Sequence, residues 1–213
     1  MGLHAFAPSR FVRGSEGFRP RLLDVFDTIA VTGDPVTLTE TKEWLRVDGT
    51  DQDDVITALI RAATEWAEFY TQRAFINRAL QVTFASFPPV GVDLYLLKPP
   101  VSQLPGIAYV DSAGADQVFD PADVTFERAT GLVRVNRDAS ENWPQNVFSA
   151  TFDYTAGFGP TDEFVPEEIK TAVKIAIAQM FEMRMDQTFG AQASKPQTKA
   201  SMALLQQFRM WRV

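Results

Sequence analysis

The sequence has no cysteine and a single histidine, His4, among its 213 residues. The absence of cysteine excludes disulfides, thiolate nucleophiles and cysteine-ligated metals. One histidine cannot build an imidazole zinc site, and a lone histidine near the chain end is more often a solvent-exposed residue than a ligand or base. Ser–His and Cys–His nucleophile systems are excluded for the same reason.

Long apolar runs are also missing. No run approaches the roughly 18 residues of a membrane-spanning helix. The N-terminus lacks the apolar core of a signal peptide, so we expect no membrane partner and a cytoplasmic origin. Hydrophobic residues make up 46% of the chain and charged residues 22%, which predicts a packed globular core.

Patterns that bind phosphate or metal are incomplete. Gly157 and Gly159 precede a helix, but the third glycine and the Lys-Ser/Thr of phosphate loops are absent. The acidic cluster at 48–54 lacks EF-hand spacing, and helix capping explains it better. Glu65 and Glu68 lie three apart, as in carboxylate-bridged metal sites, yet no Glu-x-x-His motif accompanies them. We therefore expect no catalysis, no cofactor and no metal.

The net charge of −7 is unevenly distributed. Residues 1–33 carry a net charge of +1, residues 34–183 carry −12, and residues 184–213 carry +4. Ordinary solvated surface is one interpretation. The other is that a basic C-terminal arm docks on an acidic partner, while the acidic body repels a nucleic-acid backbone.

What the sequence does contain is organised around residues 36–73, which are typical of two helices joined by an acidic turn. We expect the first helix at 37–47, capped by Thr39 and ended by Asp48-Gly49. The second is expected at 51–72, capped by Asp51. Its apolar residues recur at spacings of three and four, which is one face of an amphipathic helix: Val55, Ile56, Leu59, Ile60, Ala63, Trp66, Ala67 and Tyr70.

Alternating residues and local turns predict an antiparallel β insertion of five or six strands at 79–155. Pro99 and Pro100 are expected at a strand end on the periphery of this unit. A third helix is predicted at 165–186, then a hinge and a final helix at about 197–210. The bundle interior is expected to contain Ile56, Leu59, Ile60, Ala63, Val173, Ile177 and Phe181.

The predicted fold class is therefore α+β: a small α-helix bundle with an inserted antiparallel β unit and extended N- and C-terminal arms. Residues 1–35 form the N-terminal extension, in which Leu22-Leu23-x-x-Phe26 is expected to form a helical turn or a small apolar plug. Residues 36–186 form the main domain, and 187–213 form the hinge and C-terminal helical arm.

Three segments carry a resemblance to a known family. The first is VTLTE-x-K-x-WLRVDG-x-DQDD through AEFYTQR, at 36–73. The second is LKPPV with I-x-Y-x-D-x-x-G, at 97–114. The third is F-x-YTAGFG with VP-x-x-IK-x-A, at 152–172. In this order and spacing they resemble the head–tail connector (adaptor, or head-completion) family of tailed phages and gene transfer agents. Both arms exceed the shortest members, and Gln72 stands where many relatives have glycine.

The resemblance implies a structural role without enzyme activity. Such proteins form a ring, usually twelvefold, under the portal protein of a DNA-filled head. The ring extends the DNA channel, and a downstream stopper or tail protein docks on it. The expected location is the head–tail junction of a virion or gene-transfer-agent particle, assembled in the host cytoplasm. DNA would pass through without specific binding.

Site residues follow from this expectation. The apolar and basic C-terminal arm is expected to bind the portal through Lys199, Leu205, Phe208, Arg209, Met210, Trp211 and Arg212. Channel-lining candidates are the helix acids Asp53, Asp54, Glu65 and Glu68, because phosphate binding is driven by cations. Candidates for contacts between adjacent copies are Trp44, Trp66 and Phe69.

Two other hypotheses remain open from the sequence. A tail-terminator or tail-completion protein would also form a ring, commonly of six copies. A carboxylate-metal nuclease would use Asp51, Asp53, Glu65 and Glu68, and would lose metal-dependent DNA cleavage in Asp53→Ala.

Overall fold

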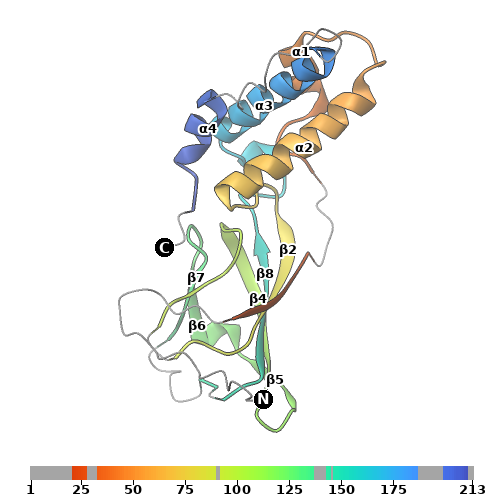
Figure 1. The fold of residues 1–213 in the computed structure, drawn as a ribbon. Coiled ribbons are helices and arrows are strands. Elements are labelled where there is room, and N and C mark those ends of the chain that lie inside the picture. Colours follow the sequence, from red (N-terminus) through yellow and green to blue (C-terminus); the bar gives the residue numbers. More distant parts are fainter. Residues whose placement is uncertain are drawn as a thin grey trace, which may run out of the picture.

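The computed structural model describes residues 21–27, 33–89, 92–136, 143–144, 146–186 and 199–210. Helices gather at one end of the molecule and strands at the other, so that the chain forms a helical lobe and a β lobe (Figure 1). The α+β class predicted from the sequence is confirmed. The helices are α1 (Leu38–Leu45), α2 (Asp53–Thr71), α3 (Glu167–Asp186) and α4 (Lys199–Gln206).

The β lobe contains two antiparallel sheets. The larger has the order β1-β2-β8-β4-β5 and the smaller has the order β3-β7-β6. Their strands are β1 (Leu22–Asp27), β2 (Arg78–Phe84), β3 (Leu94–Tyr95), β4 (Val101–Val110), β5 (Asp116–Phe119), β6 (Val124–Glu127), β7 (Leu132–Val135) and β8 (Ser149–Ala156).

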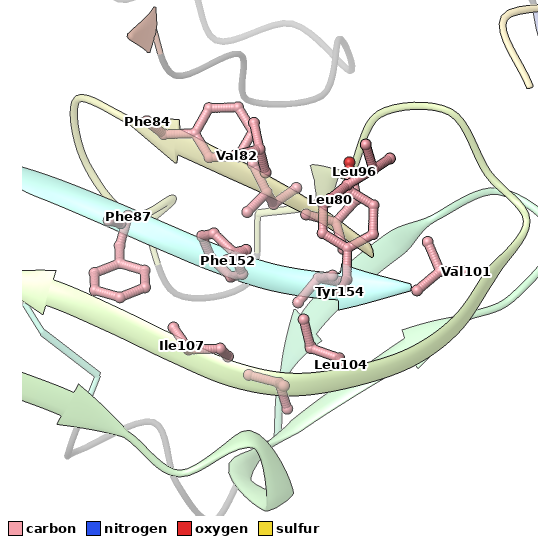
Figure 2. Packing of buried hydrophobic residues seen from close by; sticks show 14 of the residues in the cluster. Leu80, Val82, Phe84, Phe87, Leu96, Val101, Leu104, Ile107, Phe152 and Tyr154 are labelled. Carbon is pink, nitrogen blue, oxygen red and sulfur yellow. The ribbon is translucent and has the colours of Figure 1, made fainter. Parts of the chain in front are cut away.

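Alternation along the strands builds the core of the β lobe. In β2 and β8 every second side chain is buried, which is the pattern of a strand with one covered face. Figure 2 shows these side chains meeting those of β4 and the loops, with Phe152 and Tyr154 near the centre. Phe87 packs against Trp143, with ring centroids 4.5 Å apart.

The helical lobe has a separate core between α2, α3 and α4. Ile56, Ile60, Ala63, Val173 and Ile177 are buried there, as the periodicity predicted. Leu59 and Phe181 are only partly buried and pack at its margin. The predicted buried face was therefore too wide by one residue, Leu59 on α2 and Phe181 on α3.

Several local expectations need correction. The N-cap of α1 is Thr37, not Thr39: the Thr37 hydroxyl accepts from the Glu40 N–H at 3.2 Å, and the Thr37 N–H donates to the Glu40 carboxylate at 3.0 Å. The helix ends at Leu45 because Arg46 is left-handed, with φ 57°. The N-cap of α2 is Gln52 rather than Asp51, and its side chain makes no capping bond.

Two strands were missed. The Leu22–Asp27 segment is an extended strand, β1, rather than a helical turn or plug, because its backbone pairs with β2. The short β5 pairs with β4 but is largely exposed, so it has no hydrophobic alternation to reveal it. Pro99 and Pro100 lie immediately before β4, as expected of a strand end, but both are buried rather than peripheral.

Two neighbouring segments of the chain pass from one lobe to the other and are hydrogen-bonded to each other. The segment between α2 and β2 meets the segment between β8 and α3: the Phe158 N–H donates to the Phe75 carbonyl at 3.1 Å, and the Asn77 N–H to the Gly159 carbonyl at 2.9 Å. Gly157 has φ 143°, and a Cβ there would lie 2.5 Å from the Asn77 nitrogen. The glycine-containing loop therefore serves close approach of two backbones at this junction.

Candidate interaction surfaces

The C-terminal helix packs on the helical lobe. α4 lies beside α3 and α2, and Ser201 and Leu205 are fully buried. Leu205 belongs to the same core cluster as Ile177. The expected portal-binding role of Leu205 is therefore wrong for this conformation, because its side chain completes the core of its own chain.

The residues after α4 lie over the end of α2. The Met210 N–H donates to the Thr71 carbonyl at 3.0 Å. The Phe208 ring makes an edge contact with Phe158, with centroids 6.5 Å apart. The Arg209 guanidinium lies 5.1 Å from the Tyr70 ring centroid, a cation–π contact. The chain is thus held in place up to its last described residue.

Arg73 ties this segment to both lobes. Its Nε donates to the Phe208 carbonyl, its Nη1 donates to the Ala129 carbonyl at 3.0 Å, and its Nη2 lies 3.1 Å from the Met210 sulfur. Ala129 belongs to the turn between β6 and β7. Burial lowers the pKa of Arg73 from its ordinary value, although the group remains a cation at physiological pH. One guanidinium therefore connects α2, the C-terminal segment and the β lobe.

The other residues expected to bind a portal divide into three groups. Lys199 and Arg209 are exposed, and Arg209 also contacts the Tyr70 ring. Phe208 and Met210 are half-buried against their own chain. Trp211 and Arg212 lie outside the described residues. A docking surface at this end would therefore present cations on an already folded segment.

The channel-lining candidates separate in the same way. Asp54 and Glu65 are exposed on α2. Asp53 is half-buried and accepts a hydrogen bond from the Lys42 ammonium at 2.6 Å, which joins α1 to α2. Glu68 is buried, so its assignment to a channel wall is wrong.

Glu68 satisfies buried donors at the junction of the lobes. Its Oε1 accepts from the Phe75 N–H at 2.8 Å and from the Arg78 guanidinium. The Glu68 and Arg78 side chains are only 10% and 9% exposed. Because carboxylates are rarely buried unless paired, this ion pair explains why an acid stands on the core face of α2.

The aromatic candidates for contacts between copies also differ in exposure. Phe69 is 77% exposed and Trp44 is 48% exposed, with the Lys174 ammonium 5.9 Å from the Trp44 ring centroid. Trp66 is partly buried and stacks on Tyr70 at 6.0 Å between centroids. Phe69 and Trp44 are thus the exposed aromatic residues of this set.

The carboxylates of the nuclease hypothesis do not converge. Asp53 and Glu65 are separated by twelve helical positions, roughly 18 Å along the axis of α2. Asp53 and Glu68 are each paired with a cation. Among the described residues, no three histidine, cysteine or carboxylate groups come together as metal ligands. The structure gives this hypothesis no support.

Within the described ranges, no helix combines the length and apolar character needed to traverse a bilayer.

Sequence reasoning overlooked a set of exposed apolar residues in the β lobe. Val118 on β5 is 81% exposed and Phe148, just before β8, is 64% exposed. At the opposite edge, Leu22, Leu23 and Val25 on β1 are 44%, 49% and 37% exposed. The signal available in the sequence was the density of apolar residues at 22–26, which we attributed to a local plug.

The comparisons with known proteins agree with this architecture. Residues 35–100 match the family model of the phage gp6-like head-tail connector protein. No curated protein matches the chain. This match spans α1, α2, β2 and β3 and agrees with the resemblance found in the sequence.

Solved structures match over nearly the whole chain. A chain in the neck of an empty gene transfer agent (GTA) particle, computed with C6 symmetry, has a TM-score of 0.71 and 24% identity, covering 90% of this chain and 97% of its own. A chain in the virion of a native GTA particle gives 0.70 and 24%, with the same coverage. A third, in a native GTA neck computed with C12 symmetry, gives 0.68 and 22%. Residues 35–100 thus match the phage gp6-like head–tail connector model, within a fold shared with chains of these GTA structures.

Proposed function

We propose that this chain is a structural head–tail connector of a tailed phage or gene transfer agent, without enzyme activity. It forms a ring of twelve copies under the portal at the head–tail junction, extends the DNA channel and receives a stopper or tail protein. The observation that carries this proposal is the fold shared with a chain of a GTA neck over 90% of this chain and 97% of the other, together with the connector match at 35–100.

The distribution of charge supports passage of DNA without binding. The body of the chain, residues 34–183, has a net charge of −12. Of the four acids suggested for the channel wall, Asp54 and Glu65 keep exposed carboxylates on α2. Because nucleic-acid affinity depends on cations that replace counterions, such a wall repels the phosphate backbone.

The portal-facing end is assigned to the exposed cations after the third helix. Lys199 and Arg209 are exposed, with Arg209 lying over the Tyr70 ring, and Trp211 and Arg212 follow in the sequence. Leu205 is excluded from this role because it is buried. Docking then uses a preformed surface, which avoids the entropic cost of ordering a free arm.

A binding experiment on incomplete particles tests the proposal. Cells that lack this chain should accumulate DNA-filled heads separated from finished tails. Purified chain, added back, should sediment with those heads and restore their capacity to accept tails. Heads from the complete strain are the control, because their portal site is already occupied.

Two outcomes would contradict the assignment. Sedimentation of the added chain with the tails would favour the tail-terminator alternative. Normal tailed particles from cells without the chain would remove a role in head–tail joining altogether.

A further inference from the structure

The two edges of the larger sheet in the β lobe are chemically unlike. β1 lies at one edge and β5 at the other. On β1, every described side chain from Arg21 to Val25 is exposed. Leu22 pairs with Phe84 and Val25 with Val82, so these side chains share the face that is buried in the core of the β lobe. The apolar face of the sheet therefore continues past the part that this chain covers.

Among the described residues, β1 has little support from its own chain. Its backbone pairs with β2 and with no other described strand, and its apolar side chains bury little surface. Ordering a strand costs backbone entropy at every residue, while each exposed hydrogen bond returns only a modest net gain. Edge strands are commonly protected by charged side chains, proline or a β-bulge. β1 has Asp24, Asp27 and an irregularity between Leu22 and Asp24, yet its side chains Leu22, Leu23 and Val25 stay exposed. A covering surface would account for both the order and the composition of β1.

The opposite edge of the same sheet offers a matching surface. All neighbouring strands are antiparallel, so β1 and β5 run in the same direction. Following the register across the sheet places Leu22 on the same row as Gln117. Arg21 and Asp116, one residue earlier on each strand, are thus at the same height with opposite charges. Val118, the most exposed large hydrophobic residue described, lies on that edge at 81%.

We propose that β1 of each copy packs against the β5 edge of the next copy, forming the contact that closes the ring. A ring built by rotation joins two different flanks of one molecule at the same height, and these two edges meet that requirement. Arg21 faces Asp116 of the neighbour, and Val118 lies in the row of Asp24, next to the exposed Leu23. This inference rests on the proposed function and adds to it the identity of the contacting strands.

The cysteine-free sequence makes a covalent test direct. Within one chain, β1 and β5 are separated by four strand spacings, roughly 19 Å, whereas a disulfide needs Cα atoms within about 7 Å. A chain with Leu23→Cys and Val118→Cys therefore cannot bridge itself. Both positions are exposed, so the substitutions leave the fold unchanged, which circular dichroism of the purified chain checks.

The experiment uses particles in which this double variant replaces the natural chain. After mild oxidation and non-reducing denaturing electrophoresis, we expect a ladder of multimers whose highest rung equals the number of copies in the ring. Each single variant should stay monomeric. The matched control combines Val118→Cys with Thr151→Cys on the central strand β8, and should give no ladder.

Three results overturn the inference, and electron microscopy of the same particles separates the first two. A ring of this chain at the neck without the ladder means that other surfaces join the copies, and the proposed function survives. If no ring is seen at the neck, both the proposed function and the proposed contact between β1 and β5 are wrong. Dimers from Leu23→Cys alone would also overturn the inference, because two β1 edges would then meet each other.

Discussion

Arg78, the first residue of β2, donates a hydrogen bond to Glu68 in the last turns of α2, and both side chains are buried where the two lobes meet. The same carboxylate oxygen accepts the Phe75 N–H at 2.8 Å. The Glu68 carboxylate therefore holds the segment that leaves α2 and the first residue of β2. This pair joins the two lobes, as Arg73 does through the Ala129 carbonyl.

Removal of one partner should be costly. Glu68→Ala leaves the Arg78 cation buried without its counter-ion, and we expect the free energy of unfolding to fall by about 3–5 kcal/mol. Glu65→Ala, one turn earlier and exposed, is the matched control and should change it by less than about 0.5 kcal/mol. Urea denaturation of both variants measures the difference. Equal effects would show that the ion pair does not hold the junction.

The first helix offers a test of its capping residue. Thr37→Ala should lower the free energy of unfolding by about 1 kcal/mol, because the N–H of Glu40 loses its acceptor. Thr39→Ala removes an exposed threonine of the same kind within the helix, and should have little effect. Should Thr39→Ala be the more damaging change, the helix begins two residues later than described.

The capping box also predicts a response to acid. The hydrogen bond from the Thr37 N–H holds the pKa of Glu40 below its ordinary value. A carboxyl group with a lowered pKa in the folded state stabilises the fold above its unfolded pKa of about 4.3, and this contribution is lost as the pH falls through the folded value. Glu40→Gln keeps the shape but does not titrate. Between about pH 5 and pH 3, the natural chain should lose more stability than this variant; parallel curves would contradict the assignment.

The C-terminal helix should contribute to the stability of the chain. Leu205 is fully buried in the helical core, and Leu205→Ala should cost about 2–5 kcal/mol. Lys199→Ala, at the exposed start of the same helix, is the control and should leave the thermal midpoint unchanged. Truncation after residue 198 should destabilise the chain more strongly still. A truncated chain as stable as the full one would return α4 to the role of a detachable arm.

The sequence predicted the helices and strands in which apolar residues recur at a regular spacing. The spacing of Ile56, Ile60 and Ala63 marks a buried helical face, and the alternation through Leu80, Val82 and Phe84 marks a half-buried strand. Helix ends were less predictable, because Thr37 and Thr39 are both acceptable caps, and only the position of Glu40 relative to each decides between them.

Contacts between residues far apart in the sequence could not be predicted, and several of the candidate surface residues depend on them. Glu68 follows Ile60 by eight positions on the buried face of α2, but its acidic side chain favoured a solvated interpretation. Its partners Phe75 and Arg78 become visible only when the chain turns back into β2. Leu205 was typical of either an interface or a core, and periodicity cannot distinguish the two. β1 pairs with a strand more than fifty residues away, so its extended form had no local signal.

The central claim is that copies of this chain form a ring between the head and the tail, and imaging of whole particles tests it most directly. Cryo-electron microscopy of the neck, reconstructed without imposed symmetry, should show twelve copies of this fold in contact with the portal. A location on the capsid surface or along the tail would contradict the account. A ring of six copies at the tail end would instead identify the chain as a tail-completion protein.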